Sequence, residues 1–292
     1  MADAKLPAKI GTYEIRRHLA SGIMGEVYQA STMDARTKTP VYLAIKVLNP
    51  KTALRLDYLP KFRNDVRDDA VLEFKEVEYD ATYQYYFVSD FLEVKPISRQ
   101  SLRREPSNVI MDIFSRICTA VEKAHKKGYV HGNIKTSNVL IRRGEEQAAM
   151  PIVSDFGIGY LYDKEVFSGE QFASTFPYMS PEKVGELVAN VEPKNSKLTP
   201  AADVYSLTAV LVETLTGTRP FAGTSSVEEL LQAKRDRKYL MLHVNYPVCR
   251  VNIQKLNEVI RKGLSFDAGS RFASATDLGS ALAACKVAET KK

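Results

Sequence analysis

The sequence predicts an α+β fold in two parts, a strand-rich N-terminal third and a mainly helical remainder. Apolar and polar residues alternate over much of the chain between Gly11 and Glu93, which is typical of half-buried strands. After a polar linker that contains Pro96, apolar residues recur at the spacing of helix faces. We expect one domain with a flexible lead-in over residues 1–10, an N-terminal lobe over 11–93, a C-terminal lobe over 94–285 and a polar tail over 286–292.

The N-terminal part is expected to hold a sheet and a short helix. Alternation predicts strands over residues 13–22, 25–31, 41–48, 71–79 and 85–93. The first two strands are joined by a turn that contains Gly22 and Gly25. Pro60 and the apolar spacing around it predict a short helix between the third and fourth strands.

The C-terminal part is expected to be built from helices. The stretch over residues 109–128 repeats apolar residues on one face and ends at Gly128, a frequent C-terminal signal. The stretch over 202–217 is apolar nearly all round, as a buried helix would be. Amphipathic spacing predicts further helices over residues 226–236, 253–264 and 274–288.

Composition and charge argue against some classes of protein for this chain's sequence, beginning with nucleic-acid-binding proteins. The 292 residues carry a modest net charge of +6 with acidic and basic residues interspersed, which indicates a solvated surface and no nucleic-acid partner. The three cysteines are far apart and lack metal-ligand spacing, as in reduced cytosolic proteins. The first residues contain no apolar h-region, so we expect no signal peptide, and no apolar run approaches the roughly 20 residues that span a bilayer. We expect a cytoplasmic chain without a membrane segment, or the cytosolic part of a longer membrane protein.

The stretch HGNIKTSNVL carries the main functional signal. It resembles the catalytic loop of eukaryotic-type protein kinases, H-R-D-x-K-x-x-N, with His131, Lys135 and Asn138 at the family spacing. Asn133 stands where the family has its aspartate, and Gly132 where it has arginine. In the family that aspartate accepts the proton of the substrate hydroxyl, whereas an amide is a very weak base. The resemblance therefore implies a degenerate general-base position at Asn133.

The segments that would hold a nucleotide also resemble this family. LASGIMGEV resembles the Gly-rich loop, with Gly22 and Gly25 conforming and Ala20 replacing the first glycine. Lys46 in LAIK stands at the position of the lysine that holds the α- and β-phosphates. In the family this lysine pairs with a glutamate on helix αC, and alignment puts the shorter Asp65 there. Whether Asp65 and Lys46 pair is left open.

Metal and adenine positions follow from the same resemblance. Asp155 in SDFG and Asn138 would be the Mg²⁺ ligands, since carboxylate and amide oxygens suit that ion. Adenine is expected between Val27, Ala44 and Leu140. It is expected to hydrogen-bond the backbone at Asp90 and Leu92, with Ser89 in the gatekeeper position.

Three later motifs indicate structure more than chemistry. STFPYMSPEK resembles the segment that closes the family's activation region, and Thr175 keeps its family position. The DVYSL stretch at Asp203 resembles a buried helix of the C-terminal lobe. Arg271, in FDAGSRF, is implied to be the buried ion partner of Glu182.

The resemblance covers about residues 12–284, in family order, and is nearest to bacterial Ser/Thr kinase domains. It implies an antiparallel N-lobe sheet with helix αC and a helical C-lobe. We expect an ATP- and Mg²⁺-binding pseudokinase that acts as a scaffold or allosteric regulator for a signalling protein, because Asn133 replaces the general base while Lys46 and Asp155 are retained. The HGN loop also resembles that of receptor-like pseudokinases. The alternative is a weakly active protein Ser/Thr kinase. Two further hypotheses stay open: an engineered inactivating Asn133, and a kinase-like fold that binds no nucleotide.

Overall fold

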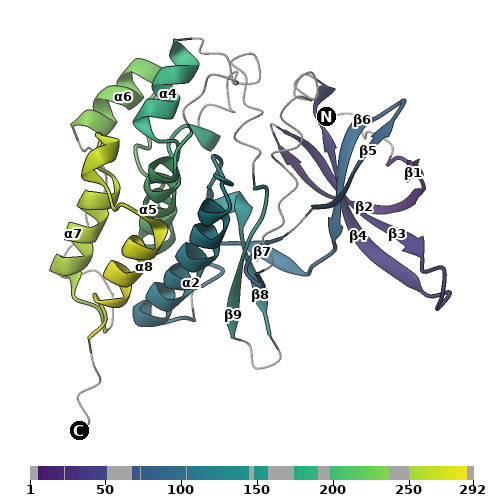
Figure 1. Ribbon diagram of the computed structural model, residues 1–292, viewed down its shortest axis with the longest axis horizontal. Helices are drawn as coiled ribbons and strands as arrows, with labels where there is room; N and C mark the ends of the chain where they lie inside the picture. The colour runs from purple at the N-terminus through teal and green to yellow at the C-terminus, as the bar shows by residue number, and fades with distance from the viewer. Residues whose placement is uncertain are drawn as a thin grey trace, which may run out of the picture.

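The computed structural model describes residues 6–22, 24–50, 68–72, 74–102, 104–144, 148–156, 174–189, 198–236 and 250–287. These residues form a strand-built lobe and a helical lobe that lie side by side (Figure 1). The architecture is the two-lobed α+β fold that the sequence predicts. The short helix expected near Pro60, together with Asp65, falls outside the described residues.

The N-terminal lobe is a six-stranded antiparallel sheet in the order β1-β2-β3-β4-β6-β5. The five longer strands are β2 (Tyr13–Gly22), β3 (Gly25–Met33), β4 (Pro40–Leu48), β5 (Phe74–Asp80) and β6 (Gln84–Asp90). Alternate residues of these strands point to opposite faces, so one face can be apolar. Ile45 and Tyr86, both fully buried, lie in the small core on that face.

Described residues near both ends of the chain make backbone contacts with the lobes. Lys9 and Ile10 form strand β1 (Lys9–Ile10) and pair with β2. Ile10 is fully buried, and this burial explains why the backbone there is ordered into the sheet. At the other end, Lys286 forms a bridge with Val251 and an ion pair with Asp112.

The predicted strand boundaries around the lobe junction also need correction. Val71, expected at the start of a strand, forms a separate parallel bridge with Val153 in the other lobe. The linker after β6 contains strand β7 (Val94–Pro96), which pairs with β8 (Val139–Arg143) at the edge of a three-stranded sheet. Pro96 is compatible with this position because an edge strand has a free side that needs no N–H donor.

The helical lobe is arranged around α5 (Pro200–Thr216). Its other helices are α2 (Ser107–Lys126), α4 (Pro181–Val188), α6 (Val227–Arg235), α7 (Ile253–Gly263) and α8 (Ala275–Ala283). Pro200 starts α5, and Gly217, with φ 74°, ends it in a left-handed cap. The sequence prediction of a helix buried all round is confirmed, because most α5 side chains are buried.

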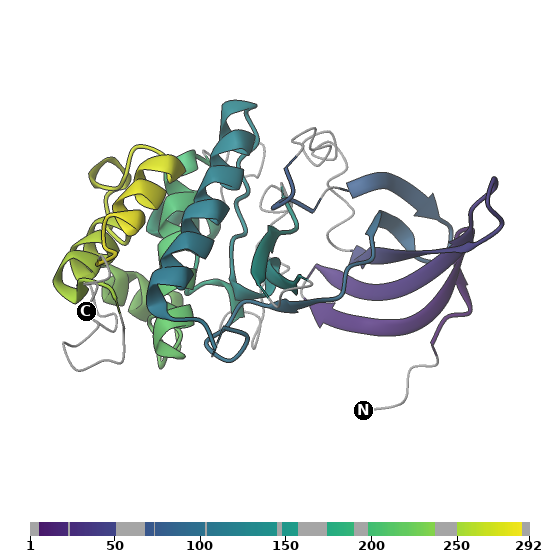
Figure 2. The same ribbon diagram turned by 90° about the horizontal axis from the view of Figure 1, so that it is seen from below.

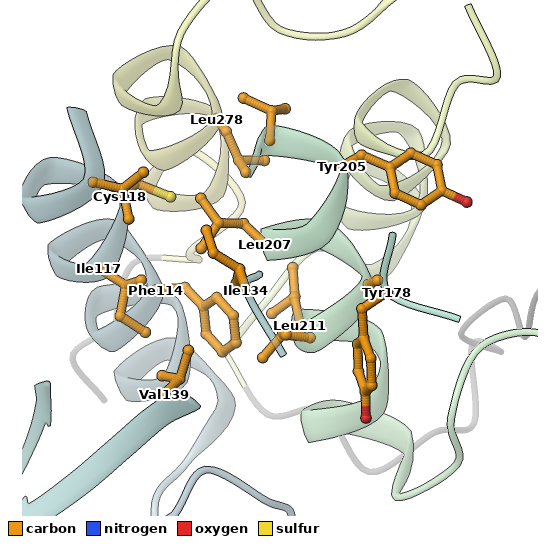
Figure 3. Packing of buried hydrophobic residues seen from close by; sticks show 14 of the residues in the cluster. Phe114, Ile117, Cys118, Ile134, Val139, Tyr178, Tyr205, Leu207, Leu211 and Leu278 are labelled. Carbon is orange, nitrogen blue, oxygen red and sulfur yellow. The ribbon is translucent and has the colours of Figure 1, made fainter. Parts of the chain in front are cut away.

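Figure 3 shows how the core of this lobe is filled. Phe114 and Ile117 from α2 pack toward Leu207 and Leu211 from α5, and all four are essentially inaccessible to water. Ile134, from the stretch that resembles a catalytic loop, lies among them. The loop is therefore fixed to the largest apolar cluster of the described residues.

The three-stranded sheet of β7, β8 and β9 (Ala149–Val153) lies between the large sheet and α2 (Figures 1 and 2). This arrangement brings three parts of the chain to one junction between the lobes. They are the segment that follows β9, the catalytic-loop stretch before β8 and the inner strands of the large sheet. No helix among the described residues is long and apolar enough to cross a membrane.

Candidate active site

A lysine from the sheet meets an aspartate from the other lobe at the junction. Lys46 lies on β4, and its Nζ donates to Oδ2 of Asp155 at 2.6 Å. Both side chains keep 14% of their surface accessible, so water can still reach the pair. Asp155 has φ 63°, a left-handed conformation that non-glycine residues seldom adopt. The structure thus brings together two of the predicted site residues that are far apart in sequence.

The predicted Gly-rich loop is the hairpin between β2 and β3. Gly22 and Gly25 pair with each other across it. Gly25 has φ 135°, and a Cβ there would come within 1.8 Å of the Val47 carbonyl oxygen, so close packing on β4 requires glycine. The neighbouring Met24 is buried in the main core, which the sequence did not indicate. These contacts fix the hairpin against the end of β4.

The residues predicted to surround adenine lie on neighbouring elements. Val27 and Lys46 are partners across β3 and β4, and Ala44 pairs with Ser89 of β6. Ser89 is buried. Leu140 comes from the other lobe on β8. Asp90 ends β6 and pairs with Leu43, and Leu92 follows in the linker. Their roles toward a nucleotide remain predictions.

The catalytic-loop stretch is held by one buried carboxylate. Asp203, on α5, accepts hydrogen bonds from the backbone N–H of His131 and of Gly132, both at 2.8 Å. It also accepts one from Nε2 of His125 on α2, at 2.7 Å. Burial alone would raise the pKa of Asp203, but the hydrogen bond and charge of His125 hold it below its usual value. Gly132 has φ 70°, which glycine adopts without steric cost.

His131 connects this loop to the segment before Asp155. Its Nε2 donates to the carbonyl of Ser154 at 2.8 Å, and its Nδ1 accepts from the backbone N–H of Asn133 at 3.2 Å. One donor and one acceptor describe a neutral imidazole. Burial lowers the pKa of His131, which favours the same neutral form. The ring packs on Phe156, with centroids 4.6 Å apart.

Asn138 is oriented by the loop itself. Its Nδ2 donates to the backbone carbonyl of Asn133 at 2.9 Å, so its Oδ1 is the end left for an electropositive partner. Ser137 Oγ donates to that oxygen at 3.2 Å, and an amide oxygen has a second lone pair for another partner. The carbonyl of Asn138 accepts from the N–H of Ser154 at 2.9 Å, next to Asp155. Hydrogen bonds therefore connect the two predicted metal-ligand positions.

Lys135 contacts the segment that begins at residue 174. Its Nζ donates to Oγ1 of Thr175 at 3.1 Å. Burial, with a smaller contribution from the charge of Lys46, lowers the pKa of Lys135 to about 8. Its ammonium form still predominates at neutral pH, so it can attract an anionic group beside Asn133.

The predicted metal-ligand positions suit an ion that binds together with phosphates better than an ion held by protein side chains alone. No group of three or more His, Cys, Asp or Glu side chains that could hold a metal occurs among the described residues. Asp155 and Asn138 offer hard oxygen ligands, and Lys46 offers a cation for phosphate oxygens. Mg²⁺ is commonly bound by one or two protein oxygens together with substrate phosphates.

Some contacts could not be read from the sequence motifs. The hydrogen bond from His125 to Asp203 was missed, although Asp203 stands in a helix predicted to be buried nearly all round. The pairing of Glu182 with Arg271 is confirmed by two contacts of 2.7 Å. Asp65 and Gly157 lie outside the described residues.

Comparison with known proteins agrees with this geometry. The family model described as "Protein kinase domain" matches residues 13–281. Curated relatives include serine/threonine-protein kinase drp72 of Corynebacterium efficiens, 28% identical over 84% of this chain and 46% of the relative. Pkn1 of Myxococcus xanthus is 26% identical over 75% of this chain and 31% of its own length. PknD of Mycobacterium tuberculosis is 26% identical over 95% of this chain and 40% of its own. The chain spans less than half the length of these relatives, and it belongs to the protein kinase family.

Proposed function

We propose that this chain is a protein Ser/Thr kinase domain that binds Mg²⁺-ATP and transfers its γ-phosphoryl group slowly to hydroxyls of a signalling protein. The observation that carries the proposal is the contact of Lys46 with Asp155, 2.6 Å, beside the oriented amide of Asn138. Protein kinase domains bind ATP with Mg²⁺ through a lysine, an aspartate and an asparagine in these positions. The Ser/Thr kinases that resemble the chain support the hydroxyl-bearing substrate class.

In this proposal each residue has one task. Lys46 binds phosphate oxygens, while Asp155 and Asn138 hold the metal that accompanies the nucleotide. Val27, Ala44 and Leu140 enclose the adenine, and the backbone at Asp90 and Leu92 hydrogen-bonds it. Lys135 attracts the phosphoryl oxygens during transfer. These assignments use general phosphoryl-transfer chemistry, in which positioning and charge account for most of the catalysis.

The transfer itself joins the acceptor oxygen to the γ-phosphorus and breaks the bond to the oxygen that bridges the β- and γ-phosphates. The acceptor hydroxyl must also release a proton. Asn133 has no carboxylate to accept it, so the proton passes to water. A general base contributes roughly 10²–10⁴ in rate, so we propose transfer that is slower by about this factor.

A second candidate is favoured by Asn133 itself. The domain would bind ATP and Mg²⁺ without phosphoryl transfer, and the nucleotide would stabilise one lobe arrangement that a protein partner recognises. This pseudokinase acts as a scaffold or allosteric regulator. The two candidates share the nucleotide site and differ only in turnover.

Transfer of labelled γ-phosphate from ATP to the chain itself, to casein and to histone separates the candidates. Asp155→Ala is the control, and Asn133→Asp is expected to raise the rate by about 10²–10⁴. Incorporation that disappears in the control supports the kinase. Nucleotide binding by calorimetry without incorporation supports the scaffold, and absence of both refutes a nucleotide site.

A further inference from the structure

A lysine on α6 is buried outside the cleft described above. Lys234 keeps 1% of its surface accessible. Its Nζ donates to the carbonyls of Pro177, at 2.9 Å, and Met179, at 3.0 Å, and lies 3.2 Å from the hydroxyl of Tyr205. The same nitrogen lies 4.4 Å from the ring centroid of Phe221. Every contact of this group is therefore inside the protein.

Stability alone does not explain a lysine at this position. Burial lowers the pKa of Lys234 well below its usual value, because an ammonium loses its hydrating water there. The positive charge of Arg271 lowers the pKa further. Replacing buried charged groups by apolar side chains of similar volume is often neutral or stabilising. What an apolar residue could not supply is a pair of directional hydrogen bonds to two carbonyls.

These bonds belong to a larger set that fixes one segment. We call residues 174–180 the acceptor-side segment. The carbonyls of Pro177 and Met179 accept from Lys234, and that of Tyr178 accepts from Ser206 Oγ at 2.8 Å. Three consecutive carbonyls are thus held by side chains of α5 and α6. Figure 3 shows Tyr178 and Tyr205 on the side of α5 away from Ile117.

The acceptor-side segment in turn contacts the catalytic loop. Thr175 accepts from Lys135 at 3.1 Å, and the hydroxyl of Tyr178 lies 3.0 Å from that of Thr136. Two consecutive loop residues therefore contact the segment that Lys234 holds. These residues are close to Asn133, where an acceptor hydroxyl would be placed.

We propose that Lys234 is a positioning residue that fixes the acceptor-side segment against the catalytic loop and thereby determines how tightly an acceptor protein binds. This inference rests on the proposed kinase function for its consequence, but its structural part can be tested without turnover. The residue acts through the segment and does not contact the nucleotide site residues in the described part of the chain.

The structural test is amide hydrogen exchange in Lys234→Met and in a matched control, Leu230→Ala. Leu230 is fully buried on the same helix, so its truncation destabilises α6 without removing these hydrogen bonds. The reporters are the N–H groups of Tyr178 and Met179, which donate to the carbonyls of Thr175 and Phe176. After correction for global stability, we expect exchange faster by on the order of tenfold in Lys234→Met only. Equal exchange in both variants would overturn the proposal.

The functional test compares the two substrates of the same assay. In Lys234→Met we expect the KM for casein or histone to rise about tenfold while the KM for ATP is unchanged. Lys234→Arg, which keeps donors at this position, is expected to recover part of the loss. A KM that rises equally for both substrates, or for neither, contradicts the proposal. If the unmodified chain transfers no phosphate, the kinase function fails, and the exchange result alone decides the role of Lys234.

Discussion

Two ion pairs of the molecule have nearly the same length but differ in their surroundings. Lys46 meets Asp155 through one contact of 2.6 Å in a junction that water can reach. Arg271 meets Glu182 through two contacts of 2.7 Å, and its guanidinium is fully buried, whereas the Glu182 side chain keeps 34% of its surface accessible. The first pair joins the two lobes, and the second joins parts of one lobe.

The hydrogen-bond inventories of the two cations explain what each pair can do. Arg271 also donates to the carbonyls of Ala201, Ser265 and Phe266, so all its N–H groups have acceptors. Lys46 has three donors, and Asp155 is its acceptor among the described residues. A ligand can therefore replace Asp155 as the partner of Lys46 at little cost in free energy. The Arg271 pair, in contrast, has a structural role.

The largest expected effect is the loss of Arg271. Arg271→Ala should lower the free energy of unfolding by about 3–5 kcal/mol, because it removes a buried guanidinium and takes a donor from the carbonyls of Ala201, Ser265 and Phe266 as well as from Glu182. Asp155→Ala should cost only about 1 kcal/mol, since water reaches that pair. Urea unfolding of both variants measures the difference. Similar losses would mean that the two pairs are equivalent.

Stabilisation by bound nucleotide should depend on the Lys46–Asp155 pair and not on the Arg271–Glu182 pair. At a Mg²⁺-ATP concentration of 100 times its Kd, the unfolding free energy of the unmodified chain should rise by about 2.7 kcal/mol. The rise should vanish in Asp155→Ala and persist in Glu182→Gln, which leaves the cleft intact. Thermal unfolding with and without nucleotide tests this. An equal rise in all three proteins would place the nucleotide elsewhere.

A smaller effect concerns the loop between the pairs. Gly132→Ala should cost about 1–2 kcal/mol because φ at this residue is 70°. The matched control is Gly185→Ala in α4, where a Cβ would meet nothing within 4 Å and alanine favours the helix. Stability of the control should rise slightly. A neutral Gly132→Ala would show that the loop can adopt another backbone conformation.

The smallest effect is a pH dependence from Glu182. Burial alone would raise the pKa of Glu182, but the hydrogen bond and charge of Arg271 hold it below its usual value of 4.5. A depressed pKa in the folded state contributes stability that is present above pH 4.5 and lost as the pH falls through the folded value. Unfolding between about pH 6 and pH 3 should show this loss, with a shallower slope in Arg271→Ala. Parallel slopes would exclude Glu182 as its source.

The fold could be predicted because its signals are local and repeated. Apolar alternation gave the strands of the large sheet, and the uniform hydrophobicity of residues 202–217 gave the buried helix. Short elements escaped prediction: β1 depends on one buried residue, Ile10, and β7 contains Pro96, which is normally unfavourable in strands. Their pairing partners are distant in sequence and leave no periodic signal.

The candidate site shows the same difference between local sequence signals and contacts of residues that are distant in sequence. Lys46 and Asp155 were found because their motifs are specific, but the contact between them is a property of the assembled lobes. Lys234 was missed because QAKRD reads as a charged helix surface. A signal was present, since Lys234 follows Leu230 by one helical turn and shares its buried face. The backbone carbonyls that accept its hydrogen bonds belong to residues 55 and 57 positions earlier in the sequence.

The two backbone hydrogen bonds to Asp203 have a genetic consequence. They fix the catalytic loop through main-chain N–H groups, so its path does not depend on the side chain at position 133. Asparagine and aspartate codons differ in a single base. One nucleotide substitution would therefore place a carboxylate in a loop that is already formed, and under the proposed kinase function this single change would separate slow from faster phosphoryl transfer.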